Sequence, residues 1–78
     1  MGVTVKLFKQ EGCSPCSALA FIMENEGIDV ELIDIEENKD ITDEYDVLTV
    51  PTTIVEKDGE VVKRYHGMFN VSELKGDK

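Results

Sequence analysis

Cys13-Ser14-Pro15-Cys16 separates an apolar run over residues 3–8 from an amphipathic stretch over residues 18–23. This order predicts a strand, a short loop and a helix that begins at the two thiols. At a helix N-terminus, unpaired backbone N–H groups and the positive end of the helix dipole favour a thiolate over a thiol. Cysteines in such settings have pKa values of roughly 3.5–7.5, compared with about 8.5 for a free thiol. Cys13, the first of the pair, is therefore expected to be nucleophilic near neutral pH.

Other uses of a cysteine pair compete with redox exchange. Structural zinc needs about four ligands, and beyond the two cysteines the chain offers only His66 as a soft or borderline donor. A structural disulfide would close so short a loop that its chain-entropy stabilisation would be small. Delivery of Cu(I) is a stronger competitor, because thiolates suit that ion and small metal-delivery domains carry the same spacing after their first strand. Redox exchange is favoured over all three, and no resident metal and no cofactor are expected.

The size of the chain predicts a single domain over residues 1–78. At 78 residues with 41% hydrophobic content, it can build one core, near the size at which burial alone gives only modest stability. No apolar stretch approaches the ~20 residues of a membrane span, and the first residues lack the features of a signal peptide. A cytoplasmic monomer is therefore expected, in which the two thiols would cycle between oxidised and reduced forms.

Acidic residues dominate the charge of the chain. Seventeen Asp and Glu against eight Lys and Arg give a net charge of −9, which argues against nucleic acid and anionic membranes as partners. Between residues 24 and 46 the only basic residue is Lys39, and most of the acidic residues there alternate with apolar ones. This pattern favours a solvated acidic face over a dedicated docking surface. The basic residues fall elsewhere, so pairing of the early strand with the late hairpin would segregate charge across the molecule.

The first half of the chain is predicted to form a strand, a helix and a second strand. Residues 3–8 alternate in a way that suits a strand with at least one apolar side. A helix is expected over residues 14–26, with Pro15 in its first turn and Gly27 at its C-terminal cap. Its core face is predicted from apolar residues at three- and four-residue spacing, namely Ala18, Leu19, Ile22 and Met23. Residues 30–35 form a second strand that looks too apolar to be half exposed, and such a unit normally makes a right-handed parallel crossover.

The second half predicts a short helix, a hairpin and a last helix. Asp40 is the expected N-cap of a helix that ends near Tyr45. Asp58-Gly59 is a strong signal for a two-residue hairpin turn between antiparallel strands. After Gly67, either Asn70 or Ser72 would cap a helix of only a turn or two, because little chain remains.

This order, β-α-β-α-β-β-α with Cys-x-x-Cys after the first strand, resembles the thioredoxin fold over nearly the whole chain. A second motif agrees, because residues 45–52, the hairpin and Gly67 match the thioredoxin pattern through its proline loop and final glycine. The resemblance implies an α/β fold with a four-stranded mixed sheet flanked by helices, the last of them short. It further implies that the Val50-Pro51 bond is cis and faces the dithiol.

The resemblance places substrate-binding residues in two loops. Because proline has no N–H, its loop would leave the backbone of Thr49 and Val50 free to meet an extended substrate strand beside Pro51. Gly67 would permit a close backbone approach. Met68 and Phe69 would then form an apolar rim near the dithiol, with core packing as the equal alternative.

The resemblance is divided between two families that use different electron donors. Length and the missing N-terminal strand–helix element are similar to glutaredoxins, whereas the stretch from residue 45 to Gly67 is thioredoxin-like. Glutaredoxins hold glutathione carboxylates with basic residues near the dithiol; Gln10 stands at that position here, with Lys9 one residue away. Small glutaredoxin-like thioredoxins, some of which serve ribonucleotide reductase and are recharged by a thioredoxin reductase, are the closer match. A glutathione-dependent glutaredoxin is the alternative.

Two family features are absent. Gly12 replaces the tryptophan that precedes the thioredoxin motif, and Leu7 stands where thioredoxins bury an aspartate that helps to deprotonate the second cysteine. Removal of the Cys16 proton would then need water, a substrate group or Lys9. Ser14 and Pro15 start the helix and tune the redox poise. The predicted mechanism is attack of Cys13 on a disulfide of a protein substrate, followed by resolution of the mixed disulfide by Cys16.

Overall fold

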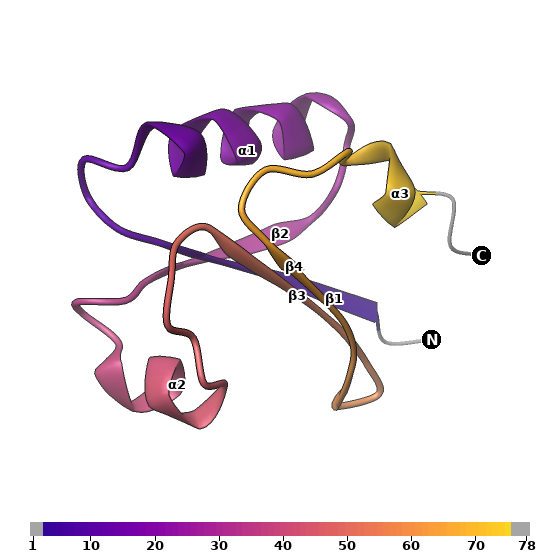
Figure 1. Cartoon of the computed structure of the whole chain (residues 1–78). Helices are drawn as coiled ribbons and strands as arrows, with labels where there is room; N and C mark the ends of the chain where they lie inside the picture. The colour runs from indigo at the N-terminus through magenta and orange to yellow at the C-terminus, as the bar shows by residue number, and fades with distance from the viewer. Residues whose placement is uncertain (1–2, 76–78) are drawn as a thin grey trace.

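A computed structural model describes residues 3–75 of the chain. The elements follow the order β1 (Val3–Lys9), α1 (Ser14–Asn25), β2 (Val30–Asp34), α2 (Lys39–Glu44), β3 (Thr52–Lys57), β4 (Glu60–His66) and α3 (Ser72–Lys75). The predicted β-α-β-α-β-β-α order is therefore confirmed (Figure 1).

The four strands form one mixed sheet in the order β2-β1-β3-β4. β1 runs parallel to β2, with Val5 opposite Val30, and antiparallel to β3, with Leu7 opposite Thr53. β3 and β4 form the predicted hairpin, and both residues of its turn have positive φ, 54° at Asp58 and 86° at Gly59. In Figure 1, α1 and α3 lie on one side of the sheet and α2 lies on the other.

The core consists of one apolar cluster on each face of the sheet. Successive residues of a strand point to opposite faces, so Val5 and Leu7 of β1 pack toward α1, while Phe8 packs toward α2. The cluster on the α1 side consists of Val5, Leu7, Leu19, Met23, Val55 and Val71. The cluster on the α2 side consists of Phe8, Ile33, Val47 and Ile54, with Ile41 and Tyr45 packed against it. β1 is thus covered on both faces, and its C-terminal end leads directly into the cysteine loop.

The buried face of α1 differs in part from the predicted one. Cys16, Leu19 and Met23 are buried, but Ala18 and Ile22 are exposed. The helix turns its stripe i, i+3, i+7 from Cys16 toward the sheet, and Ala20 is partly buried beside it. The helix ends at Asn25, one residue earlier than predicted, and Gly27 follows its cap with the positive φ of 76° that a C-terminal glycine provides.

The start of α2 was predicted incorrectly, because Asn38 and not Asp40 is its N-cap residue. Asn38 belongs to a turn that closes back on β2: its backbone N–H and its side-chain amide both donate to the carbonyl of Asp34. The helix therefore begins at Lys39, and Asp40 lies in its first turn. At the other end, Asp46 follows the cap residue Tyr45 with a left-handed φ of 55°.

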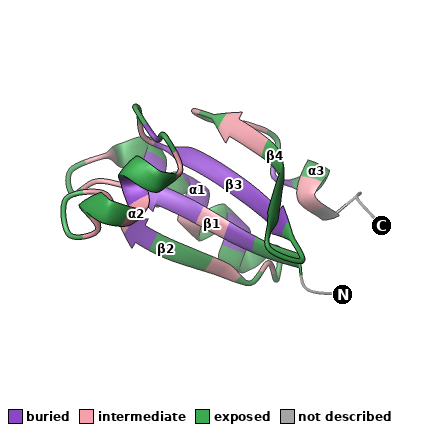
Figure 2. Cartoon of the chain, turned by 90° about the horizontal axis from the view of Figure 1, so that it is seen from below, coloured by how far each residue is buried: buried purple, intermediate pink, exposed green. Residues whose placement is uncertain are grey.

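The apolar composition of residues 30–35 predicted a strand that would not be half exposed, and β2 differs from that prediction. It lies at the edge of the sheet, where Figure 2 shows it largely exposed. Ile33 is buried, but Leu32 is 43% exposed. The reason is the strand order, because among residues 3–75 only β1 pairs with β2. At the other end of the chain, the side-chain oxygen of Asn70 accepts from the N–H and the hydroxyl of Ser72, the first residue of α3.

A polar cluster fixes α2 to the sheet. Lys6 Nζ donates to Glu56 Oε1 at 2.7 Å, and the Tyr45 hydroxyl donates to Glu56 Oε2 at 2.6 Å. These two hydrogen bonds hold the pKa of Glu56 below its ordinary value, and the bond to Glu56 raises the pKa of Lys6 and of Tyr45. Arg64 of β4 donates to the backbone carbonyl of Tyr45. Segregation of charge was predicted to follow if the early strand paired with the hairpin. β1 does pair with the hairpin, but the positive charge of Lys6 is neutralised by the carboxylates of Glu56 and Glu31.

Candidate active site

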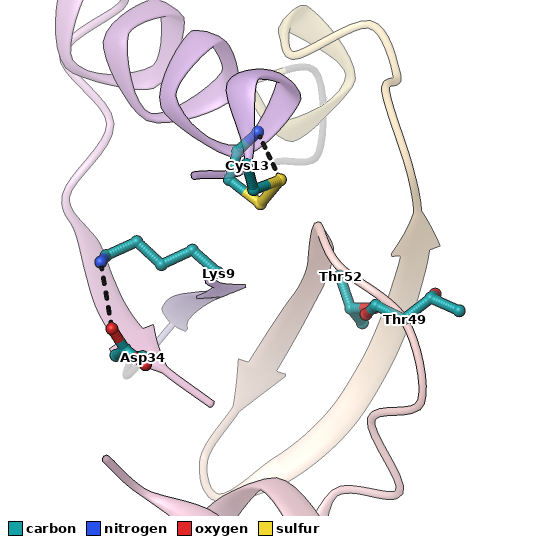
Figure 3. The surroundings of a disulfide bond; sticks show 6 residues. Lys9, Cys13, Asp34, Thr49 and Thr52 are labelled. Atoms are coloured by element: carbon teal, nitrogen blue, oxygen red, sulfur yellow. Dashed lines mark hydrogen bonds and ion pairs between the residues drawn. A yellow bond between two sulfur atoms is a disulfide. The ribbon is translucent and has the colours of Figure 1, made fainter. Parts of the chain in front are cut away.

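The two cysteines form a disulfide at the junction of β1 and α1 (Figure 3). The S–S distance is 2.20 Å and the Cα–Cα distance is 5.3 Å. The chain turns into this position at Gly12, whose φ of 87° is in the region that favours glycine. The turn is closed by a hydrogen bond of 3.1 Å from the Cys13 N–H to the Gln10 carbonyl.

Cys13 is the N-cap residue of α1, and its sulfur takes part in the cap. Its backbone is extended, and Sγ accepts a hydrogen bond of 3.2 Å from the Cys16 N–H. Pro15, in the first turn, has no N–H that would need a partner. The two cysteines differ in exposure, because Cys13 is partly exposed whereas Cys16 is only 1% exposed. An incoming group would therefore meet Cys13 first, with Cys16 behind it.

The loop before β3 lies across from the disulfide, as the positions of Thr49 and Thr52 in Figure 3 show. The Val50-Pro51 bond is cis, as predicted. The Thr52 hydroxyl donates to the Thr49 carbonyl at 2.6 Å and closes the loop. Within residues 3–75, neither the N–H nor the C=O of Val50 has a backbone hydrogen-bond partner. The predicted free backbone is thus centred on Val50, since the Thr49 carbonyl is already engaged.

The loop after β4 lies beside the proline loop. The Gly67 N–H donates to the Pro51 carbonyl at 2.8 Å. The predicted reason for glycine was wrong, because a Cβ at this position would meet no atom within 4 Å; what favours glycine is a φ of 80°. Met68 is exposed, whereas Phe69 stacks on Tyr65 with ring centroids 4.0 Å apart and packs against the core. Of the two residues, only Met68 is exposed as a rim residue would have to be, and the core alternative holds for Phe69.

Lys9 does not direct its charge at the dithiol. In Figure 3 its side chain extends away from the disulfide toward β2, where Nζ lies 3.9 Å from Asp34 Oδ2. Gln10, at the position where glutaredoxins carry a basic residue, donates to Glu36 at 2.9 Å. Lys9, predicted as a basic residue near the dithiol, lines the same pocket as Cys16, but its charge is paired with Asp34.

Leu7, which stands where thioredoxins bury an aspartate, and its partner on the neighbouring strand are both uncharged. Leu7 is fully buried, and Thr53 lies opposite it on the neighbouring strand, also fully buried. The hydroxyl of Thr53 has no hydrogen-bond partner among the described residues. Sequence reasoning missed this residue, because a threonine in an apolar strand is an ordinary strand former. It also missed Leu48, which stands 91% exposed next to Thr49 and could have been noticed as a large apolar residue in a loop.

No group of three or more His, Cys, Asp or Glu within residues 3–75 is placed to hold a metal ion. In the same part of the chain, no helix has the length and apolar character needed to cross a membrane.

The strand order, the cysteine pair and the cis-proline loop together define a thiol–disulfide oxidoreductase of the thioredoxin fold. The model of the thioredoxin domain family matches residues 1–75, and the chain belongs to that family. The chain is 34% identical over 68 residues to the thioredoxin of Bacillus subtilis (strain 168), covering 80% of this chain and 65% of that protein. It is 29% identical over 79 residues to the thioredoxin of Listeria monocytogenes, covering 94% and 77%. The chain thus spans about two thirds to three quarters of the length of these relatives.

Solved structures agree with this assignment. Thioredoxin 1 from Thermosipho africanus TCF52B superposes with a TM-score of 0.74 at 34% identity, over 94% of this chain and 86% of that one. A mutant thioredoxin from Halobacterium salinarum NRC-1 gives a TM-score of 0.85 at 31% identity, over 95% and 69%. The predicted thioredoxin fold is therefore confirmed.

Proposed function

We propose that this chain reduces disulfides of protein substrates through Cys13 and Cys16. The observation that carries the proposal is the asymmetry of the pair: Cys13 is partly exposed and its Sγ accepts the Cys16 N–H at the start of α1, whereas Cys16 is buried. An N–H that already points at the sulfur stabilises a thiolate there once the disulfide is reduced.

The proposed reaction has two exchange steps. The Cys13 thiolate attacks one sulfur of the substrate disulfide, which breaks that bond, forms a mixed disulfide and releases a substrate thiolate that takes up a proton. Cys16 loses its proton and attacks Cys13 Sγ, which restores the Cys13–Cys16 bond and releases the second substrate sulfur as a thiolate that is then protonated. Two electrons pass from the protein to the substrate. Ser14 and Pro15, which form the first turn, set the poise of this cycle.

Substrates would be held mainly through backbone. An extended segment can pair with the N–H and C=O of Val50, next to Thr49 and Pro51, as strands added to a sheet edge do. Gly67 and Met68 border this position, since the Gly67 N–H bonds to Pro51. Met68 offers an adaptable apolar contact to varied substrates.

We further propose that a thioredoxin reductase recharges the dithiol, in the cytoplasm and with the chain as a monomer. The thioredoxin relatives support this donor, and so does the pairing of Lys9 with Asp34, which engages the cation proposed for a glutathione carboxylate. Ribonucleotide reductase is the target to test first. Glutathione is the competing donor.

The test measures reduction of a model protein disulfide with two recharging systems, thioredoxin reductase with NADPH and glutathione with glutathione reductase. Cys13→Ser should abolish turnover, and Cys16→Ser should instead accumulate mixed disulfides. Turnover with the glutathione system alone would refute thioredoxin reductase as the electron donor. Absence of turnover with both systems, together with tight Cu(I) binding, would refute the redox function in favour of metal delivery.

A further inference from the structure

A groove separates α1 from the edge strand β2 and begins at the dithiol. Gly12 and Cys16 line its start, and Ala20 and Phe21 of α1 and Leu32 of β2 line its far part. This groove lies on the α1 face of the sheet, at the edge that no other strand covers among residues 3–75. It is separate from the loops of Val50 and Gly67, neither of which contributes a lining residue.

Two large apolar side chains of the groove, one from α1 and one from β2, are exposed. Phe21 is 65% exposed and Leu32 is 43% exposed. Scattered single apolar residues on a surface need no explanation, but two that line one concave site mark a place where a partner can bury apolar surface. One edge of β2 has no partner strand among residues 3–75, and an extended chain can add there by backbone hydrogen bonds.

The charge of the groove selects its partner. Lys9, the one cation among its described lining residues, is paired with Asp34. The carboxylates of Glu11 and Glu24 also line the groove, and neither makes an ion pair with another described side chain. The chain as a whole carries a net charge of −9. Self-repulsion therefore disfavours a second copy in this groove, and a basic segment is favoured.

We propose that the groove between α1 and β2 is a docking site for an extended segment of a partner protein that alternates apolar with lysine or arginine side chains. The inference deepens the proposed function, because it names the chemistry of the partner segment that lies next to the disulfide being exchanged. The apolar side chains of the segment contact Phe21 and Leu32, and its cations meet Glu11 and Glu24. Substrate choice is then set in part outside the proline loop.

Binding of short cysteine-free, dye-labelled peptides to the oxidised protein tests the site without any turnover. One peptide alternates leucine and lysine, a second leucine and glutamate, and a third serine and lysine. Fluorescence anisotropy should show binding of the first peptide that weakens as salt is added. The other two should bind at least about tenfold more weakly, because each lacks either the charge or the apolar contacts.

Matched variants locate the binding. Phe21→Gln and Leu32→Thr should each weaken binding of the leucine–lysine peptide roughly tenfold, since each removes a contact that becomes buried on binding. Ile22→Gln, on the same helix, and Val61→Thr, on the opposite edge strand, should change it less than about twofold. Ile22 and Val61 are 37% and 45% exposed and lie outside the groove.

Four outcomes would overturn the proposal. Three concern the peptides: no binding at millimolar peptide, equal binding of the glutamate peptide, and equal losses in the Ile22 and Val61 variants. Self-association that Phe21→Gln abolishes would also overturn it, in favour of a second copy as the occupant. Since none of these measurements needs redox turnover, failure of the docking site and failure of the proposed reductase activity are told apart.

Discussion

Substitution of Lys6 by methionine removes the cation that faces a nearly buried carboxylate. Lys6 and Glu56 keep only 17% and 10% of their side-chain surface exposed, and their ion pair is 2.7 Å long. A hydrogen bond to a charged group contributes about 1.5–3 kcal/mol. Loss of one partner of a buried pair costs about 3–5 kcal/mol, because the remaining charge stays desolvated. Tyr45 still donates to Glu56 in the variant, so we expect a loss near the low end, about 2–3 kcal/mol in the free energy of unfolding at pH 7.

The pH dependence of this loss follows from the direction of the pKa shifts. The folded protein holds the pKa of Glu56 below its ordinary value of 4.5, so the pair contributes fully above that value and loses its contribution as the pH falls through the lower, folded-state pKa. The pKa of Lys6 is raised above 10.5, so the contribution persists up to that pH and is lost as the pH rises through the raised pKa. The difference between wild type and Lys6→Met should therefore be largest between these limits and shrink in acid.

Urea unfolding of wild type, Lys6→Met, Glu56→Leu and the double variant, each in the oxidised form, gives the coupling energy. The double variant should recover most of the loss, because apolar residues of similar volume can replace a buried pair at little cost. A loss below about 0.5 kcal/mol for Lys6→Met, typical of an exposed pair, would refute the reasoning. So would a double variant whose loss equals the sum of the two single ones.

Three further predictions concern single residues. Thr53→Val should raise the free energy of unfolding by about 1 kcal/mol, because it removes a buried hydroxyl without a partner; a loss in urea unfolding would mean that the hydroxyl is satisfied. Asp46→Gly should raise it by about 0.5–1 kcal/mol, since glycine adopts the left-handed φ after α2 without a steric penalty; an unchanged melting temperature would contradict this. Leu19→Ala should cost about 3 kcal/mol by leaving a cavity under α1, whereas Leu48→Ala should stay within about 0.5 kcal/mol; similar effects in thermal unfolding would contradict the burial assignments.

Local signals in the sequence were sufficient for elements that local chemistry controls. The Asp58-Gly59 turn, the Gly27 cap and the start of α1 at the cysteine pair all lie where their residues predict them. The cis bond before Pro51 followed from the resemblance of two separated motifs, because no single residue specifies it.

Features that depend on tertiary context were not predictable in the same way. The apolar content of β2 suggested a central strand, but periodicity does not encode strand order, and the strand lies at the edge. Asn38 replaced Asp40 as a cap because a turn onto β2 started the helix earlier. The direction of Lys9 depended on Asp34, a partner distant in the sequence that becomes its neighbour only when β1 and β2 pair.

The Asp58-Gly59 turn connects β3 and β4 at one end of the hairpin. At the other end, the hydrogen bond from the Gly67 N–H to the Pro51 carbonyl connects the two loops that flank the hairpin. The Gly67 amide proton can exchange with solvent deuterium only when this hydrogen bond breaks, because a bonded N–H is protected from exchange. Its exchange rate thus measures the free energy of opening of the loop at this one hydrogen bond, without any substrate. A bound substrate segment on Val50 would slow that exchange, which gives a spectroscopic readout of substrate engagement in variants that no longer turn over.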